Sequence, residues 1–352
     1  MEPAETQNAE TRKLGLSRGR CLVLWLIGLS AVATVAVAAL VGIFAYSNHQ
    51  FVSPGDAPDT VFVVPEGAGV NRVATRLEAE GLIPDARTYR LVMRLRDPDA
   101  RLVPGEFAIP AGASPETITD ILKSGKVILY RFTAPEGLTS AQVVARMDAH
   151  DVLVDDDPDV PPEGVLLPDT YTFPRGTTQS EVLQWMRDAH SGVMEELWAS
   201  RAPDLPISTP DEARILASIV EKETGVGAER AEVAGVFTNR LRRGMRLESD
   251  PTIIYGISGG EPLGRGLRRS EIDRRTDYNT YRIDGLPPTP IANPGREALA
   301  AVLRPADTDA LFFVADGTGG HAFARTYREH QRNVRRWRRI ERELRQRETS
   351  SD

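Results

Sequence analysis

Two glutamates at the end of one apolar segment are the residues of this sequence best suited to chemistry. They occur in residues 215–225, ILASIVEKETG, where Glu221 and Glu223 stand two positions apart. A helix turns by about 100° per residue, so these two side chains point in nearly opposite directions. The apolar stripe of the predicted helix consists of Ile215, Leu216, Ile219 and Val220. Glu223 falls close to the centre of that stripe, whereas Glu221 is predicted to face solvent.

A carboxyl group on the apolar stripe suits acid catalysis. Such a group is costly to bury unless it has a partner or lines a cleft, and removal from water raises its pKa from about 4.3 toward neutrality. An acid that is protonated near pH 7 can protonate the oxygen of a glycosidic bond. The alternative for Glu223 is an ordinary helix-end residue, solvated or paired with an arginine. Glu221 is expected to pair with an arginine at the surface, worth about 1 kcal/mol or less.

The other residue types with catalytic potential form no recognised constellation. No two histidines stand at a metal-ligand spacing such as i, i+4, and Cys21 is the only cysteine. The histidines are His49, His150, His190, His321 and His330. A Gly-x-Ser-x-Gly elbow and a phosphate-binding loop are also absent from the sequence. We therefore expect no metal and no cofactor, and catalysis would rest on carboxylates, hydroxyls and amides.

The overall charge argues against one class of partner. The formal net charge is -7, and recognition of a phosphate backbone needs a basic surface, so nucleic acid is not an expected ligand. The length of 352 residues and the hydrophobic content of 41% are ordinary for a globular protein with two or three domains.

A long uncharged segment predicts a membrane anchor. Residues 21–46 contain no charged side chain across 26 positions, and as a helix they would span roughly 39 Å, more than the ~30 Å hydrocarbon core. The run is longer than the core of a signal peptide. Basic residues precede it, namely Arg12, Lys13, Arg18 and Arg20. The first charge that follows is Asp56, so residues 1–20 are predicted to be a cytoplasmic tail and the remainder to lie outside the cytoplasm.

A strand, turn and helix pattern recurs three times after a linker at 47–59. The turns are Pro65-Glu-Gly67, Pro110-Ala-Gly112 and Pro135-Glu-Gly137, and each follows a β-prone stretch, TVFVV at 60–64, GEFAI at 105–109 and LYRFTA at 129–134. Gly69, Ser114 and Thr139 then stand where helix N-terminal caps are expected, so short helices are predicted at 71–81, 115–124 and 140–150. Residues 60–153 are therefore predicted to be small α+β modules, LysM-like in layout. They either bind glycan or act as spacers.

The remainder of the chain predicts a larger domain of mixed structure. The acidic, proline-rich segment 154–164 indicates a boundary, residues 154–345 form the predicted domain, and 346–352 form a tail. Helices are expected at 179–200, 211–224, 229–243, 296–303 and 325–347, and a strand at 310–315. The predicted fold class is α+β throughout, preceded by a single transmembrane helix.

Three long blocks carry a resemblance to a known family. They are LASIVEKETGVGAERAEVAGVFTNRLRRGMRLESDPTIIYG at 216–256, DYNTYRIDGLPPTPIANPG at 277–295 and LFFVADGTGGHAF at 311–323. The segment EGVLLPDTYTF, from Glu163, is similar to the stretch that precedes the catalytic motif in the same family. Together they closely resemble the YceG-like family, the endolytic murein transglycosylases. The resemblance extends from the anchor to about residue 340, but the N-terminal modules match only in layout.

The resemblance implies an enzyme that cuts nascent peptidoglycan strands internally, at the β-1,4 bond between N-acetylmuramic acid and N-acetylglucosamine. The catalytic glutamate of the family falls on Glu223, the residue that the helical period also selects. It would protonate the bridging oxygen and then take the proton of the muramic acid 6-hydroxyl, which closes a 1,6-anhydro ring. Because the substrate supplies the nucleophile, the second carboxylate of an ordinary glycosidase is not needed.

Supporting polar and aromatic groups are expected to hold the sugar. The candidates are Asp250 and Tyr255 in SDPTIIYG, Asn279 and Tyr281 in YNTY, and Glu163. Each has a structural alternative: Asp250 could cap a turn before Pro251, and the tyrosines could be core aromatics. His321, after GTGG, is expected to be a turn residue, with a place at the rim of the cleft as the alternative.

Two other functions are compatible with the sequence. A muramidase would cut the same bond with water, and a glycan-binding scaffold without activity would recruit cell-wall synthases through the modules at 60–153. In the family, penicillin-binding proteins are the expected partners. The expected location is the cell inner membrane, crossed once.

Overall fold

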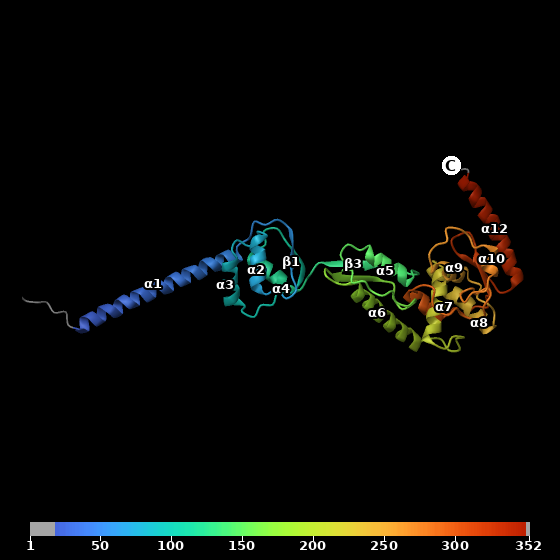
Figure 1. Cartoon of the computed structure of the whole chain (residues 1–352), viewed down its shortest axis with the longest axis horizontal. Coiled ribbons are helices and arrows are strands. Elements are labelled where there is room, and N and C mark those ends of the chain that lie inside the picture. Colours follow the sequence, from blue (N-terminus) through green and yellow to red (C-terminus); the bar gives the residue numbers. More distant parts are fainter. Residues whose placement is uncertain (1–17, 350–352) are drawn as a thin grey trace, which may run out of the picture. The chain divides into compact units, whose positions relative to one another are not determined.

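The N-terminal apolar segment forms one helix, α1, at Arg18–Val52 (Figure 1). The structure is a computed structural model that describes residues 18–349. Apolar side chains are exposed along α1 from Val23 onward, which fits a single-pass membrane anchor and agrees with the span predicted at 21–46. Arg12 and Lys13 lie outside the described residues, so the direction in which α1 crosses a membrane stays a prediction.

The chain divides into two compact units, residues 1–128 and 129–352. In the first unit, two antiparallel strands pair with Phe62 opposite Phe107. The elements are β1 (Thr60–Val64), α2 (Val70–Ala79), α3 (Ala86–Arg96), β2 (Gly105–Ile109) and α4 (Pro115–Ser124). Both phenylalanines are buried against apolar residues of the helices, including Leu77 and Leu122. The end of α1 joins this core through Phe51, whose ring centre lies 5.7 Å from that of Tyr89.

The second unit begins with a further antiparallel pair, which brings together segments on both sides of the predicted boundary at 154. Strand β3 (Leu129–Thr133) pairs with β4 (Thr170–Pro174). Helices α5 (Ser140–Asp148) and α6 (Gln179–Ala199) cover this pair, and all four elements share one apolar cluster. The third turn motif also contacts the helix that carries Glu223, because Lys222 Nζ donates to the Gly137 carbonyl at 3.1 Å. The third repeat thus lies in the second unit.

Helices dominate the rest of the second unit. The elements are α7 (Pro210–Glu223), a 3-10 turn at Gly227–Glu229, α8 (Arg230–Arg242), α9 (Asp250–Ser258), α10 (Arg269–Asp273), α11 (Arg296–Leu303), β5 (Phe312–Ala315), β6 (His321–Ala324) and α12 (Tyr327–Thr349). Helices α7, α8 and α11 pack together around a core that includes Leu216, Phe237 and Leu299. β5 and β6 form an antiparallel hairpin.

The mixed helix and strand class is confirmed, and so are the three strand-turn-helix units. Ser114 and Thr139 cap their helices with side-chain hydrogen bonds, whereas Gly69 makes no such bond. The LysM-like identity of the modules is not shown by this architecture. Helix α9 was not predicted, because its segment is rich in glycine and proline. Pro251 occupies the first turn and Gly259 the left-handed C-terminal cap, the two positions where these residues bound a helix rather than break it.

Candidate active site

Helix α7 carries Glu223 at its last position. Its N-terminus is held by a reciprocal pair of hydrogen bonds between Thr209 and Glu212, which satisfies two backbone N–H groups. The helix ends after Glu223 because Thr224 is extended. The buried face includes Leu216, Ile219 and Val220. Glu223 therefore lies at the C-terminal end of a firmly packed helix, where the helix dipole disfavours negative charge.

Ser249 is the hydrogen-bond partner of Glu223. Its hydroxyl donates to Glu223 Oε1 at 2.5 Å, and only 1% of its surface is exposed. Ser249 is itself held by its neighbours, because its N–H donates to Thr280 Oγ1 at 2.9 Å and its carbonyl accepts from Thr252 Oγ1 at 2.7 Å. The orientation of the Glu223 carboxyl group is therefore set by a buried hydroxyl network.

The protein environment raises the pKa of Glu223 to about 7. Burial is the largest cause, and the nearby charge of Asp250 acts in the same direction. The bond from Ser249 and the interactions with His321 and Arg240 act in the opposite direction and lower the pKa. Glu223 nevertheless keeps partial solvent exposure. At neutral pH this carboxyl group can thus both release and accept a proton.

Glu221 is buried, and the prediction that it faces solvent is wrong. Its side chain is 5% exposed, its Oε2 accepts the Gly295 N–H at 2.9 Å, and its Oε1 lies 3.6 Å from Arg230. The helical period correctly predicted that Glu221 points away from Glu223. The segment before α11, however, covers that side of α7. Burial raises the pKa of Glu221 as well. Glu221 therefore contacts the residue that precedes α11 and Arg230, and it helps α7 to pack against α11 instead of binding Ser249.

Glu221→Ala is expected to lower the free energy of unfolding by about 3 kcal/mol, because Arg230 and the Gly295 N–H lose a buried acceptor. Urea unfolding of the full chain in detergent measures this. Glu136→Ala is the matched control, since its carboxylate also lies near Arg230, at 3.5 Å, but its side chain is 44% exposed. That variant should lose about 1 kcal/mol or less. Equal losses in the two variants would contradict the buried role of Glu221.

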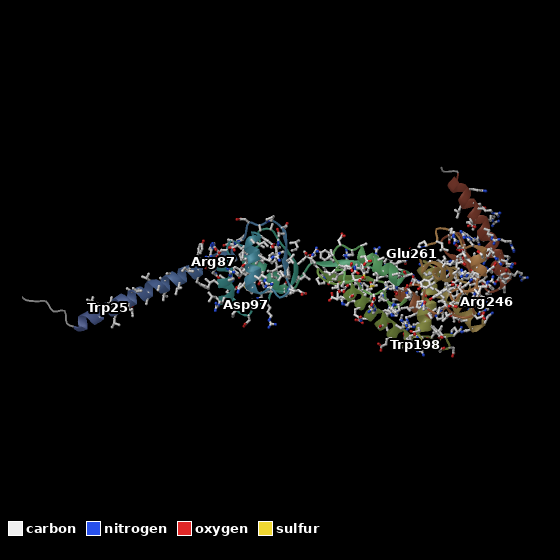
Figure 2. The ribbon with its side chains drawn as sticks, viewed as in Figure 1. Trp25, Arg87, Asp97, Trp198, Arg246 and Glu261 are labelled. Atoms are coloured by element: carbon white, nitrogen blue, oxygen red, sulfur yellow. The ribbon has the colours of Figure 1, made fainter. Side chains whose placement is uncertain are left out.

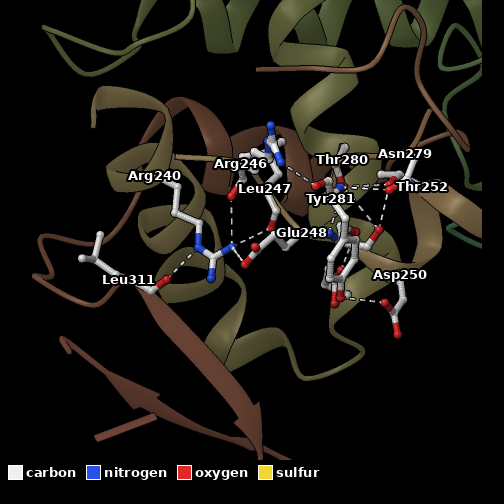
Figure 3. Close-up of polar contacts among 12 residues, drawn as sticks. Arg240, Arg246, Leu247, Glu248, Asp250, Thr252, Asn279, Thr280, Tyr281 and Leu311 are labelled. Atoms are coloured by element: carbon white, nitrogen blue, oxygen red, sulfur yellow. Dashed lines mark hydrogen bonds and ion pairs between the residues drawn. The ribbon is translucent and has the colours of Figure 1, made fainter. Parts of the chain in front are cut away.

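Asp250 and Tyr281 lie within electrostatic range of Glu223 and bind each other. The Tyr281 hydroxyl donates to Asp250 Oδ1 at 2.8 Å (Figure 3). Burial and the charges of Asp250 and Glu223 raise the pKa of Tyr281 far above its ordinary value, so the phenol stays protonated. Asp250 is exposed and opens α9. This pair offers a carboxylate and a hydroxyl within electrostatic range of Glu223.

The side chain of Asn279 forms its hydrogen bonds within the protein. It is 1% exposed, and its amide nitrogen lies within hydrogen-bond distance of the carbonyl oxygens of Glu271, Ile272 and Arg274. Its amide oxygen accepts the Tyr281 N–H at 3.0 Å. The predicted contact between Asn279 and a sugar would break these bonds. We infer that Asn279 instead holds the loop that presents Tyr281.

Tyr255 and Glu163 lie near each other, and their contacts are with α5 and the loop before α11. Glu163 Oε2 accepts the Ser140 N–H at 3.0 Å, at the first turn of α5, and burial raises the pKa of Glu163. Burial and the charge of Glu163 raise the pKa of Tyr255 to about 12. The Tyr255 ring packs against Tyr278, with ring centres 5.1 Å apart. Both predicted residues thus make contacts that stabilise the second unit.

Arg240 fixes the loop that leads to Ser249, and sequence reasoning missed it. Its guanidinium donates to the Leu311 and Leu247 carbonyls at 2.7 and 2.9 Å and to Glu248 Oε2 at 3.1 Å (Figure 3). Glu248 has a backbone φ of 52°, a strained value for a residue with a side chain. Arg240 is 7% exposed. It therefore joins α8, the residue that precedes β5 and the strained loop directly before Ser249.

His321 begins β6 and is held by a carboxylate. Glu229 Oε1 accepts the His321 N–H at 3.0 Å, and Glu229 Oε2 lies 2.8 Å from His321 Nδ1. The imidazole is close enough to affect the pKa of Glu223. The sequence offered only the flanking GTGG turn as a signal. Among residues 18–349, no group of three or more His, Cys, Asp or Glu side chains could hold a metal ion.

Comparison with known proteins finds relatives over most of the chain. It is 28% identical to the endolytic murein transglycosylase of Bacillus subtilis (strain 168) over 312 residues, which cover 79% of this chain and 84% of that protein. It is also 28% identical to the endolytic murein transglycosylase of Streptococcus pneumoniae serotype 2 (strain D39), with 84% of this chain covered. The match covers 63% of the pneumococcal protein, so this chain spans less than two thirds of that relative.

One solved structure matches much of the chain. It is a yceG-like protein from Listeria monocytogenes, with a TM-score of 0.49 and 25% sequence identity, and the match covers 78% of this chain and 98% of that chain. The model of the YceG-like family matches residues 62–336, which is more than half of the chain. This protein therefore belongs to the YceG-like family.

Proposed function

We propose that this protein is a membrane-anchored lytic transglycosylase that cuts peptidoglycan strands internally. The names of the relatives from Bacillus subtilis and Streptococcus pneumoniae support murein as the substrate and a lyase as the enzyme class. The bond cut would be the β-1,4 bond between N-acetylmuramic acid and N-acetylglucosamine, and the new ends would carry 1,6-anhydro-muramic acid. Cleavage of this kind would end the elongation of a strand.

One observation carries the proposal. Glu223 combines a pKa raised to about 7 with partial solvent exposure and a fixed orientation on Ser249. A group with a pKa near the working pH transfers protons efficiently in both directions. A lytic transglycosylase needs both directions from a single residue.

In the proposed mechanism, protonated Glu223 donates its proton to the bridging oxygen as the bond to the anomeric carbon of the muramic acid breaks. The resulting oxocarbenium-like sugar is then attacked by its own 6-hydroxyl oxygen. The Glu223 carboxylate takes the proton of that hydroxyl, so the enzyme returns to its starting form. One bond breaks and one forms, the two protons balance, and no water is consumed.

Asp250 and Tyr281 are proposed to contact the sugar during this cycle. Both lie within electrostatic range of Glu223, and Asp250 is exposed. The negative charge of Asp250 would favour the oxocarbenium-like state, and the Tyr281 ring could stack on a sugar face. Asp250 also keeps Glu223 protonated by raising its pKa.

Mass spectrometry of a peptidoglycan digest tests the reaction type. The purified chain is incubated with uncrosslinked glycan strands, and the fragment ends are identified. Anhydro-muramic ends are the expected product. Reducing ends would overturn the lyase assignment in favour of a muramidase, and an absence of fragments would favour a scaffold that binds glycan without cutting it.

The pH dependence of cleavage should follow the protonation of Glu223. Because the acid form is needed first, activity should be lost as the pH rises through about 7. Ser249 lowers the pKa of Glu223, so Ser249→Ala should move this alkaline limb upward by about one pH unit. Ser258→Ala, at the far end of the helix that follows Ser249, is the matched control because its hydroxyl bonds to the Ile254 carbonyl. An unchanged limb in Ser249→Ala would contradict the assignment.

The proposed location follows from α1. We place the N-terminus in the cytoplasm, α1 across the cell inner membrane and residues from about 49 onward outside it, as the basic residues before the span predict. Cell-wall synthases such as penicillin-binding proteins are the proposed partners. In this scheme the second unit carries the catalysis, and the first unit links it to the membrane.

A further inference from the structure

The exposed apolar part of α1 has the length of a bilayer core. Trp25 is 79% exposed and Tyr46 is 65% exposed, and the large side chains exposed between them are apolar. Figure 2 shows side chains projecting from α1 along this stretch, with Trp25 near its N-terminal end. The 21 residues of separation correspond to about 32 Å of helix, close to the ~30 Å of hydrocarbon. Aromatic residues are typical of both membrane interfaces. The outer boundary of the hydrocarbon thus falls at about Tyr46.

The first unit covers α1 directly beyond that boundary. Ser47 and Phe51 are each 4% exposed, although they continue the same helix. Asn48 Oδ1 accepts a hydrogen bond from Arg96, at the end of α3, and Phe51 packs on Tyr89 in the middle of α3. The lipid headgroups occupy about 5–8 Å beyond the hydrocarbon, which is the depth of four or five helical residues. Helix α3 is therefore packed against the part of α1 that lies in the headgroup layer.

The outward face of α3 combines basic and apolar side chains. Four exposed residues of α3 form this face, namely Arg87, Leu91, Arg94 and Leu95, whereas the exposed Arg96 binds Asn48 and Glu116 on the other side. Leu91 is 41% exposed and Leu95 is 58% exposed. The four occur at spacings of four, three and one, so they share one side of the helix, while Tyr89, Val92 and Met93 are buried on the other. Figure 2 places Arg87 beside the end of α1.

The acidic groups at the C-terminal end of α3 already have partners. Asp97 binds Lys123 at 2.5 Å, and Glu116 binds Arg96 at 2.6 Å. These pairs leave Arg94 without an acidic partner among them, while the N-cap residue Asp85, which accepts the Thr88 N–H, lies within electrostatic range of Arg87. A helix with leucines and arginines on one face is suited to an anionic lipid surface, where the leucines enter the acyl boundary and the arginines bind phosphates.

We propose that α3 is an interfacial helix, whose outward face of Arg87, Leu91, Arg94 and Leu95 binds anionic phospholipids at the outer surface of the membrane. The inference rests on the proposed anchor role of α1. Helix α3 would thus be a second membrane contact beside α1, and it would hold the first unit in the headgroup layer.

Depth-dependent quenching in proteoliposomes tests the proposal. The full chain carries Cys21→Ser and one new cysteine bearing an environment-sensitive fluorophore, and the vesicles contain phosphatidylglycerol with spin-labelled lipid as quencher. A label at Leu91→Cys should shift to the blue and be quenched. Val61→Cys is the matched control, since Val61 is 54% exposed on β1, on the side of the first unit away from α1 (Figure 1). It should remain unquenched.

A third label separates this proposal from the anchor itself. Val35→Cys lies in the middle of the span, at 69% exposure. Strong quenching there with none at Leu91→Cys would overturn the interfacial role of α3 alone. An unquenched label at Val35→Cys would instead overturn the anchor.

The lipid chemistry is tested by charge removal. Arg87→Gln and Arg94→Gln should each reduce the docked fraction reported by the label at Leu91→Cys roughly fivefold in anionic vesicles. In vesicles of phosphatidylcholine alone, the unsubstituted arginines should give little quenching. Equal quenching in both lipids, insensitive to the two substitutions, would contradict recognition of anionic headgroups.

Discussion

Glu223→Gln is expected to abolish cleavage of glycan strands, with a fall in rate of about a thousandfold or more. The glutamine side chain is nearly the same size and can still accept the hydrogen bond from Ser249, which lies at 2.5 Å in the native protein. It has no acidic proton for the leaving oxygen and no carboxylate for the 6-hydroxyl. Both proposed proton transfers therefore fail. The measurement is the rate of fragment formation, read by mass spectrometry.

Glu221→Gln is the matched control for that experiment. It makes the same change two residues earlier on the same helix, at a carboxylate that binds Arg230 and the Gly295 N–H. We expect this variant to keep most of its activity while it loses stability, because only the charge opposite Arg230 is removed. If both variants lost activity equally, the assignment of Glu223 as the acid and base would fail.

Stability measurements separate loss of chemistry from loss of folding. The pKa of Glu223 is raised from 4.5 to about 7 in the folded protein. The folded state therefore binds more protons than the unfolded state between these values, and the native protein loses stability as the pH rises through this window. The penalty reaches about 3 kcal/mol above pH 7. Glu223→Gln removes it, so the inactive variant should unfold at a higher urea concentration than the native protein at pH 8 and show no such gain near pH 4.

Arg240→Ala should have the second largest effect. Removal of this buried guanidinium leaves the Leu311 and Leu247 carbonyls without their donor and releases Glu248 from its ion pair. The expected loss of stability is about 3–5 kcal/mol. Because the strained loop at Glu248 leads directly to Ser249, the carboxyl group of Glu223 would also lose its fixed orientation. Displacements of this kind cost roughly a hundredfold in rate.

Arg246→Ala is the control for Arg240→Ala. Arg246 stands in the loop that Arg240 holds, but its side chain is exposed, and it binds Asp284 and the Tyr281 carbonyl. Its loss should cost about 1 kcal/mol or less. Arg240→Lys keeps the charge but cannot reproduce the planar set of donors, so an intermediate rate is expected from a folded protein. If Arg240→Ala were as mild as Arg246→Ala in both rate and urea midpoint, Arg240 would not position the site.

The fold could be predicted where its signals are local. Strand β2 and helix α4 begin and end at the predicted residues, because a helix cap and a change of hydrophobic period lie within a few positions of each boundary. Helix α3 and strand β4 were missed. Strand β4 is a five-residue strand with little apolar alternation, and its partner β3 lies some 40 residues earlier. The pairing of two strands so far apart along the chain produces no local pattern from which β4 could be predicted.

The predicted site residues divide along the same line. Asp250 and Tyr281 lie within electrostatic range of Glu223, whereas Asn279 is buried and bonded within its own loop and Glu163 binds the first turn of α5. A polar residue type shows what a side chain could bond to, but not which backbone groups will reach it first. Ser249 and Arg240 are ordinary residues in the sequence, and their importance arises only from the groups they meet.

The sequence by itself determined the long apolar helix α1, which follows from an uncharged run of 26 residues, and the direction of Glu223, which follows from the period of α7. The direction of Glu221 also followed, but its exposure did not, because the segment that covers it lies 74 residues further along the chain. Only the tertiary structure placed the Ser249 hydroxyl at hydrogen-bond distance from Glu223 and buried most of that carboxyl group. The raised pKa is therefore a property of the packed unit, because it depends on how much water the distant segments exclude.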